Sequence, residues 1–163
     1  MLILMYLGAI VVANLLIAHY GAWVSSYVAF AFIGLDITAL DHLHDAWHNK
    51  GLWWKMSGLI ATGSFLSWLL NRDAGRIGIA SFVAFLISAI VDRAVYAMAH
   101  KKGQYERIMI SNFGSSLTDS ILFPLLAFGW PPNPAIIFGQ FTAKLAGGAF
   151  WALILGKRGK ASS

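Results

Sequence analysis

The chain has 163 residues, of which 58% are hydrophobic and only 12% are charged. Soluble globular domains carry roughly 25% charged residues, so this composition argues against that class and indicates a membrane protein. The absence of cysteine excludes a disulfide framework and a thiolate metal site. The net charge of +5 does not indicate a nucleic-acid partner, because the basic residues gather at the ends of apolar stretches rather than along one helix face.

Six apolar stretches follow one another, each close to the length that crosses a hydrocarbon core of roughly 30 Å. They lie at 1–18, 22–41, 53–70, 77–99, 108–129 and 135–155. We therefore predict an all-α, polytopic membrane protein with six transmembrane helices in a compact bundle. The bundle would be a single domain over residues 1–156, followed by a short basic cytoplasmic tail at 157–163.

The distribution of lysine and arginine predicts the orientation in the membrane. With the N-terminus inside, cytoplasmic segments would hold eight basic residues, against only Arg72 and Arg76 outside. This bias predicts a multi-pass protein of the inner membrane with both termini in the cytoplasm. Met1 to Leu35 holds no charged residue, so the basic start of a secretory signal is missing and we expect the first helix to be retained.

The fifth stretch carries a polar face. At 100° per residue, five of its polar side chains fall within an arc of about 140°. They are Ser111, Asn112, Ser115, Ser116 and Asp119. Alone, each serine is also explained by a hydrogen bond to its own helix or to a neighbouring helix.

Asp119 lies about 16 Å along its helix and therefore near the bilayer centre, and Lys144 lies at a similar depth in the last stretch. An isolated charge at this depth costs several kcal/mol, and pairing is the usual remedy. We predict that Asp119 and Lys144 face each other across the bundle and contribute to a substrate site.

Four further polar residues complete the candidate substrate-binding set. They are Asn14, Asp36, Asp92 and Gln140. Gln140 shares a helix face with Lys144. Asp92 also has a simpler explanation, because it could neutralise the neighbouring Arg93 while that side chain reaches the membrane interface.

A histidine cluster supports an alternative function. His42, His44 and His48 stand beside Asp41 and Asp45, and this combination has metal-ligand chemistry. A metal-dependent membrane enzyme is the alternative that this cluster supports. Because membrane di-iron enzymes need several such clusters, we favour a solvated interfacial loop and predict no metal site.

Several motifs resemble those of the vitamin uptake transporter family of queuosine-precursor transporters. The motifs are Ala13-Asn14-Leu15, Phe32-Ile33-Gly34-Leu35-Asp36, Ala80-Ser81-Phe82 followed by Asp92, Ser111 through Ser120, and Phe141-Thr142-Ala143-Lys144. The resemblance implies a fold similar to the substrate-binding components of energy-coupling-factor importers. It also implies import of 7-deazaguanine bases, namely 7-cyano-7-deazaguanine or 7-aminomethyl-7-deazaguanine.

The chemistry of these residues agrees with a guanine-like ligand. A guanine edge offers an N1–H donor beside an exocyclic amino donor, which one carboxylate can accept together, and its carbonyl oxygen accepts from an amide or lysine. Asp119 or Asp92 could accept, and a flat ring could stack on Phe113 or on a nearby Trp or Tyr. We expect a transporter of this or another small solute rather than an enzyme, with no cofactor and no nucleic-acid partner. We expect the protein to lie in the lipid bilayer. The sequence leaves open whether transport is coupled to protons and whether the protein forms a homo-oligomer or binds a membrane partner.

Overall fold

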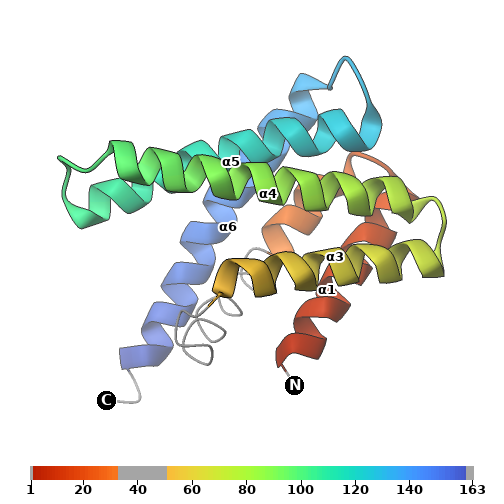
Figure 1. Cartoon of the computed structure of the whole chain (residues 1–163), viewed down its shortest axis with the longest axis horizontal. Helices are drawn as coiled ribbons and strands as arrows, with labels where there is room; N and C mark the ends of the chain where they lie inside the picture. The colour runs from red at the N-terminus through yellow and green to blue at the C-terminus, as the bar shows by residue number, and fades with distance from the viewer. Residues whose placement is uncertain (1, 33–50, 161–163) are drawn as a thin grey trace.

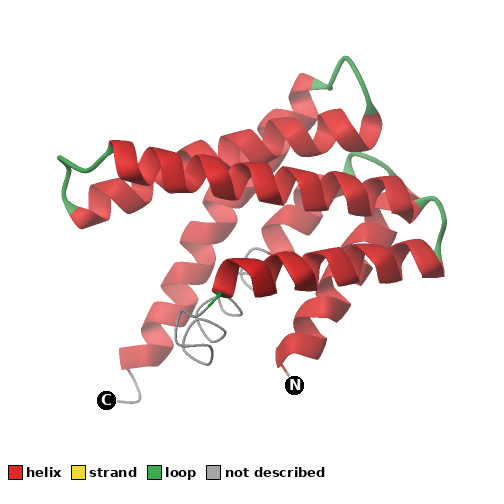
Figure 2. Ribbon diagram, viewed as in Figure 1, coloured by secondary structure: helices red, strands yellow, loops and turns green. Residues whose placement is uncertain are grey.

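The computed structural model describes residues 2–32 and 51–160 and is helical throughout these two segments, without a strand (Figures 1 and 2). The helices are α1 (Leu2–Tyr20), a helical segment at 24–32, α3 (Leu52–Leu70), α4 (Ala74–Met98), α5 (Gln104–Phe128) and α6 (Pro134–Lys160). The all-α prediction is confirmed. The boundaries of α1, α3, α4 and α5 agree within a few residues with the predicted ones, and α6 continues to Lys160, through residues 157–160 that we expected in the tail. The predicted end of the second stretch, at residue 41, lies outside the described residues.

Two of the described helices are long and apolar enough to cross a membrane, over Ile3–Tyr20 and Ala74–Met98. Polar residues explain why α5 and α6 are less apolar than these two helices. A row of serines interrupts the apolar sequence of α5, and α6 ends in Lys157, Arg158 and Lys160. The arrangement of six membrane spans therefore stays a prediction.

α4 lies at the centre of the bundle, between α3 and α5, and also packs against α1 (Figure 1). Its pairing with α5 is the most extensive in the described chain, and α6 packs on the other side of α5. Small residues allow the close approach of α3 and α4. A Cβ atom built on Gly78 would lie 3.1 Å from the backbone oxygen of Ser64, so a larger residue would push the two helices apart.

Short turns join the helices. Turns at 21–23, 71–73 and 129–133 lie toward one end of the molecule, and the α4–α5 turn lies at the opposite end (Figure 1). α5 ends at Gly129, whose φ of +96° favours glycine, and α6 begins where Asn133 Oδ1 accepts a hydrogen bond from the backbone N–H of Ala135. Antiparallel neighbours with short turns are the arrangement expected of membrane helices.

The main hydrophobic core lies where α1, the segment 24–32, α4 and α5 meet. Its buried residues are Ile17, Val28, Ile77, Ala80, Ala84, Phe123 and Ala127. A second, smaller cluster joins Tyr6 of α1 to Met56 and Ile60 of α3. Between these two clusters, α1 presents polar and small side chains to the cavities described below.

Candidate functional site

Two adjoining cavities, of about 320 and 170 Å³, lie in the middle of the bundle. The larger reaches the size range of small-molecule sites, roughly 300–1,000 Å³. Both cavities are lined by Ala13, Asn14, Phe32, Ser81, Asp119 and Phe123. α1, the segment 24–32, α4 and α5 therefore all contribute to one hollow, and α6 closes the smaller cavity with Gln140 and Lys144.

Asp119 and Lys144 form an ion pair in this hollow, in which Lys144 Nζ donates to Asp119 Oδ2. The side chains are 27% and 15% exposed, respectively, so water reaches them only in part. The predicted pairing of Asp119 on α5 with Lys144 on α6 is thus confirmed. Since charges in such surroundings are weakly screened, the pair can offer a ligand both a charged donor and a charged acceptor.

Asn14 joins three helices beside this ion pair. Its Nδ2 donates to Ser67 Oγ of α3 at 3.1 Å, and its Oδ1 accepts from Ser81 Oγ of α4 at 3.2 Å. Ser67 in turn donates to the Gly63 carbonyl. Asn14 is 2% exposed, so these hydrogen bonds replace the ones that water would supply. The side chain holds α1, α3 and α4 in register around the cavity.

Gln140 performs a similar task for α6. Its Nε2 donates to Ser25 Oγ at 2.8 Å, and Ser25 Oγ donates to the Ala22 carbonyl. Gln140 is also 2% exposed and lines the smaller cavity one helical turn before Lys144. The bond fixes α6 against the segment 24–32 and orients the face that carries Lys144.

The sequence of the chain matches, over residues 2–155, the family model described as "Putative vitamin uptake transporter". The chain belongs to this vitamin uptake transporter family. No curated protein and no solved structure matches the chain. The family and the two long apolar helices indicate a membrane protein with a transport function.

Of the predicted site residues, the fold brings Asn14, Asp119, Gln140 and Lys144 to the cavities. The serines and the amide on the N-terminal half of α5 do not line them. Ser115 Oγ donates to the carbonyl of Asn112 in its own helix, the simpler role that we considered, and the Asn112 side chain is exposed. Ser116 is half-buried outside both cavities.

Asp92 lies away from the cavities on α4, in the part of the helix that packs against α5 near Gly114. Its Oδ1 atom is buried and accepts no hydrogen bond within the described residues. Asp36 and the cluster of His42, His44 and His48 lie outside the described residues. Within residues 2–32 and 51–160, no three histidine or carboxylate side chains come together as metal ligands.

Of the aromatic rings considered for stacking, Phe113 lies outside the cavities. Phe113 packs edge-on against Phe141, with ring centroids 5.1 Å apart, and lines neither cavity. The rings at the cavities belong instead to Tyr6, Phe32, Phe85 and Phe123. Phe113 and Leu117 are four residues apart and therefore share one face of α5, and this face is exposed. The residue type alone does not reveal this exposure.

Sequence reasoning also missed Ser25, Ser67 and Ser81 as members of the polar site. Each lies in an apolar stretch and hydrogen-bonds a buried amide of another helix. The signal that could have found them is chemical: a buried amide needs partners, and small hydroxyls at the same depth on other helices can supply them.

Proposed function

We propose that this chain is a membrane transporter that imports a queuosine precursor, 7-cyano-7-deazaguanine or 7-aminomethyl-7-deazaguanine, through the central cavities. The observation that carries the proposal is the Asp119–Lys144 ion pair at a hollow that is also lined by aromatic rings, in a member of the vitamin uptake transporter family. In this view six helices cross the inner membrane and both termini are cytoplasmic.

The ion pair suits the polar edge of a deazaguanine. The N1–H and the exocyclic amino group of the base donate together to the Asp119 carboxylate, and Lys144 donates to the adjacent carbonyl oxygen. Both interactions use charged partners, which makes them stronger than those between neutral groups. Adenine, which presents a different donor and acceptor pattern, would leave the Lys144 ammonium facing an amino group.

The aromatic wall suits the flat ring system. Phe32 and Phe123 line both cavities, and the larger cavity adds Tyr6 and Phe85. Stacking of a base on such a ring stabilises binding by roughly 1–3 kcal/mol and tolerates differences at the edge of the base. The rings therefore supply affinity, and the ion pair supplies discrimination.

Protons are the proposed coupling ion, because the two charged groups at the cavities exchange partners when a substrate binds and each can carry a proton. The test is uptake into cells or vesicles with and without a protonophore. Uptake that continues up a concentration gradient after the proton gradient collapses contradicts this coupling and leaves the substrate assignment intact.

The deciding experiment uses a host that lacks both its own importer and precursor synthesis. Cells expressing the protein receive a low concentration of either deazaguanine, and queuosine in tRNA is measured. We expect wild type to restore queuosine, and Asp119→Asn and Lys144→Ala to abolish it at equal expression.

The matched controls are Asp73→Asn and Lys101→Ala, which remove the same kinds of charge at exposed positions in turns far from the cavities. They should restore queuosine as wild type does. Correctly inserted wild type that fails to restore queuosine with either precursor contradicts the proposed substrate.

A further inference from the structure

Two arginines at the α3–α4 end of the bundle have guanidinium groups that contact no carboxylate of the described residues. Arg72 stacks on Trp68, with its Cζ atom 4.0 Å from the ring centroid. Arg76 Nε donates to the Leu126 carbonyl of α5 at 3.1 Å. In the described part of the chain no carboxylate oxygen lies within ion-pair distance of either group, although Asp73 stands in the same turn. Both side chains are exposed, so most of their N–H donors are available.

A hollowed surface begins at these guanidinium groups. One hollow, of about 360 Å³, is lined by Arg72 and Arg76 together with apolar residues of α4 and α5. A second, of about 350 Å³, continues between α3 and α4 and is lined mainly by apolar side chains, including Phe65 and Phe82. The two hollows share Trp68, Gly75 and Ile79, so they adjoin across the start of α4, and we treat them together as one groove.

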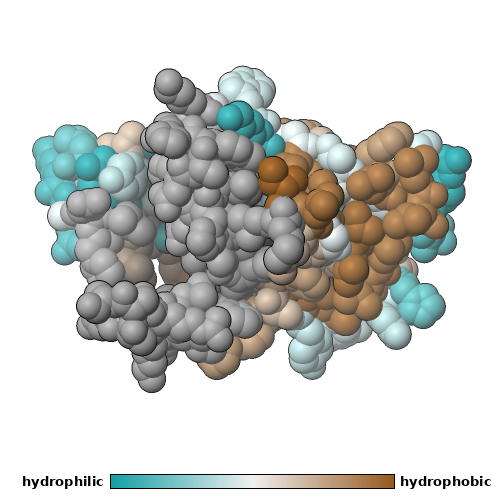
Figure 3. Space-filling model, turned by 90° about the horizontal axis from the view of Figure 1, so that it is seen from below, coloured by the Kyte–Doolittle hydropathy of each residue, from teal (hydrophilic) through white to brown (hydrophobic). Residues whose placement is uncertain are grey.

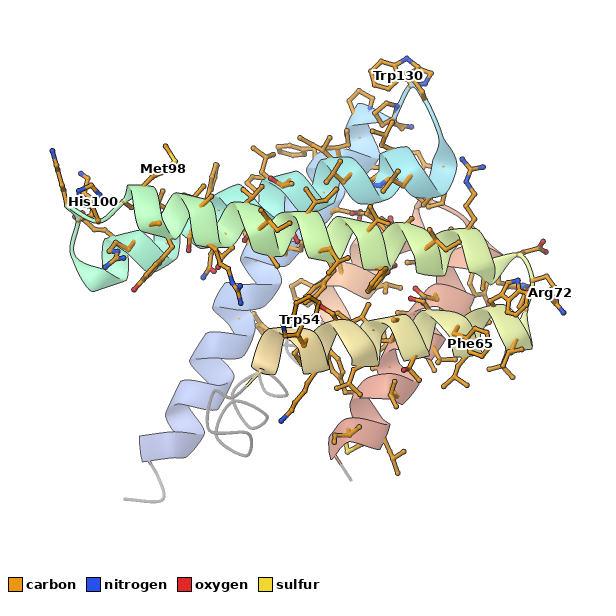
Figure 4. The ribbon with its side chains drawn as sticks, in the orientation of Figure 1. Trp54, Phe65, Arg72, Met98, His100 and Trp130 are labelled. Carbon is orange, nitrogen blue, oxygen red and sulfur yellow. The ribbon has the colours of Figure 1, made fainter. Side chains whose placement is uncertain are left out.

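The surroundings of the groove are apolar and outward-facing. Phe65 is 55% and Ile79 65% exposed, and both line the groove. In Figure 4 Phe65 and Arg72 lie near the same end of α3, whereas Met98 and His100 lie at the opposite end of the molecule. The described surface in Figure 3 is broadly hydrophobic toward the α3–α4 turn and becomes hydrophilic at that edge.

We propose that this groove binds one anionic phospholipid, whose phosphate is held by Arg72 and Arg76 and whose acyl chain lies along Phe65, Ile79 and Phe82. Guanidinium groups bind phosphate oxygens through paired N–H donors, and the stacking of Arg72 on Trp68 holds its group in place without using those donors. Because the apolar groove starts at the arginines, a lipid satisfies both halves of the site. Free phosphate would satisfy only one.

This inference depends on the membrane placement in the proposed function and not on the transported substrate. The test is native mass spectrometry of the full chain purified in mild detergent and titrated with dioctanoyl phosphatidylglycerol. Dioctanoyl phosphatidylcholine, glycerol 3-phosphate and inorganic phosphate are titrated in parallel. The variant is Arg72→Gln/Arg76→Gln, and the matched control is Lys101→Gln/Lys102→Gln at the opposite, equally exposed end.

We expect one phosphatidylglycerol to bind in preference to phosphatidylcholine and the two phosphates without acyl chains not to bind. The arginine double variant should bind phosphatidylglycerol about 30-fold more weakly, since each cation near an anionic headgroup contributes about fivefold, whereas the lysine variant should bind as wild type does. A second variant, Ala61→Phe, fills the apolar half and should weaken binding while the arginines remain.

Equal binding of both lipids, or unchanged binding by the arginine variant, overturns the proposal. Binding of inorganic phosphate as strongly as of the lipid also overturns it, because the groove would then be an anion site. A protein that imports deazaguanine normally and binds no lipid here would retain its proposed function and lose this inference. A protein that binds the lipid and imports no deazaguanine would retain this inference and lose its proposed function.

Discussion

Asn14 of α1 donates a hydrogen bond to Ser67 of α3 at 3.1 Å, so a buried amide joins two helices at the level of the central cavities. The same amide accepts from Ser81 of α4, which makes it the point where three helices meet. Buried polar contacts of this kind determine how membrane helices rotate relative to one another, because apolar surfaces slide more freely.

Asn14→Ala should lower the free energy of unfolding by about 1–2 kcal/mol, because the hydroxyls of Ser67 and Ser81 lose an interhelical partner. Thermal unfolding in detergent measures the change. Ser115→Ala is the control, since its hydroxyl contacts only its own helix, and it should change stability by less than about 0.5 kcal/mol. Equal effects of the two substitutions would show that the interhelical bonds do not contribute.

Removing one member of the Asp119–Lys144 pair should destabilise the protein more than replacing both members. Asp119→Leu leaves the Lys144 ammonium without this carboxylate, and Lys144→Met leaves the carboxylate without the ammonium. Each single substitution should lower the free energy of unfolding by somewhat less than the roughly 3–5 kcal/mol that is typical of breaking a fully buried pair, because these side chains keep some contact with water.

The double variant Asp119→Leu/Lys144→Met should recover most of that stability while failing to restore queuosine in the complementation assay. Thermal unfolding and the uptake readout are measured on the same preparations. If the single and double variants unfold at the same temperature, the charges are not coupled. If the double variant transports normally, the pair is structural rather than substrate-binding.

Gln140→Leu keeps the volume of the side chain and removes its bond to Ser25. We expect unfolding stability to fall by about 1 kcal/mol and uptake to fall with it, because α6 is no longer held against the segment 24–32 and Lys144 loses its position. Thr142→Val on the same helix is the control, because Thr142 donates only to carbonyls of α6 and is exposed. An effect of Thr142→Val as large as that of Gln140→Leu would contradict this role.

Gly78→Ala should destabilise the bundle by about 1–3 kcal/mol, because the new methyl group would lie 3.1 Å from the Ser64 backbone, which cannot move aside as a flexible side chain can. Gly58→Ala meets nothing within 4 Å and should be neutral or stabilising by about 0.5–1 kcal/mol through helix propensity. Thermal unfolding of Gly78→Ala and Gly58→Ala under the same conditions measures both changes in stability. A neutral Gly78→Ala would mean that α3 and α4 approach each other less closely than 3.1 Å implies.

Local patterns of apolar and charged residues were enough to predict the helices and to identify the charges that need a partner in a hydrocarbon environment. The apolar stretches predicted the bounds of α1, α3, α4 and α5 and the start of α6 to within a few residues, because helix length and turn chemistry are local properties. The cost of a single charge near the middle of an apolar stretch was enough to pair Asp119 with Lys144 before their distance was known.

Which polar residues meet depends instead on how the helices pack. Periodicity places Ser115 and Asp119 on one face of α5, yet Ser115 bonds its own helix while Asp119 lines the cavities. Periodicity likewise does not reveal that Phe123, rather than Phe113, lines the hollow. The reason is physical: the order of residues around a helix is local, whereas the rotation and crossing angle of that helix depend on how its ridges pack against its neighbours.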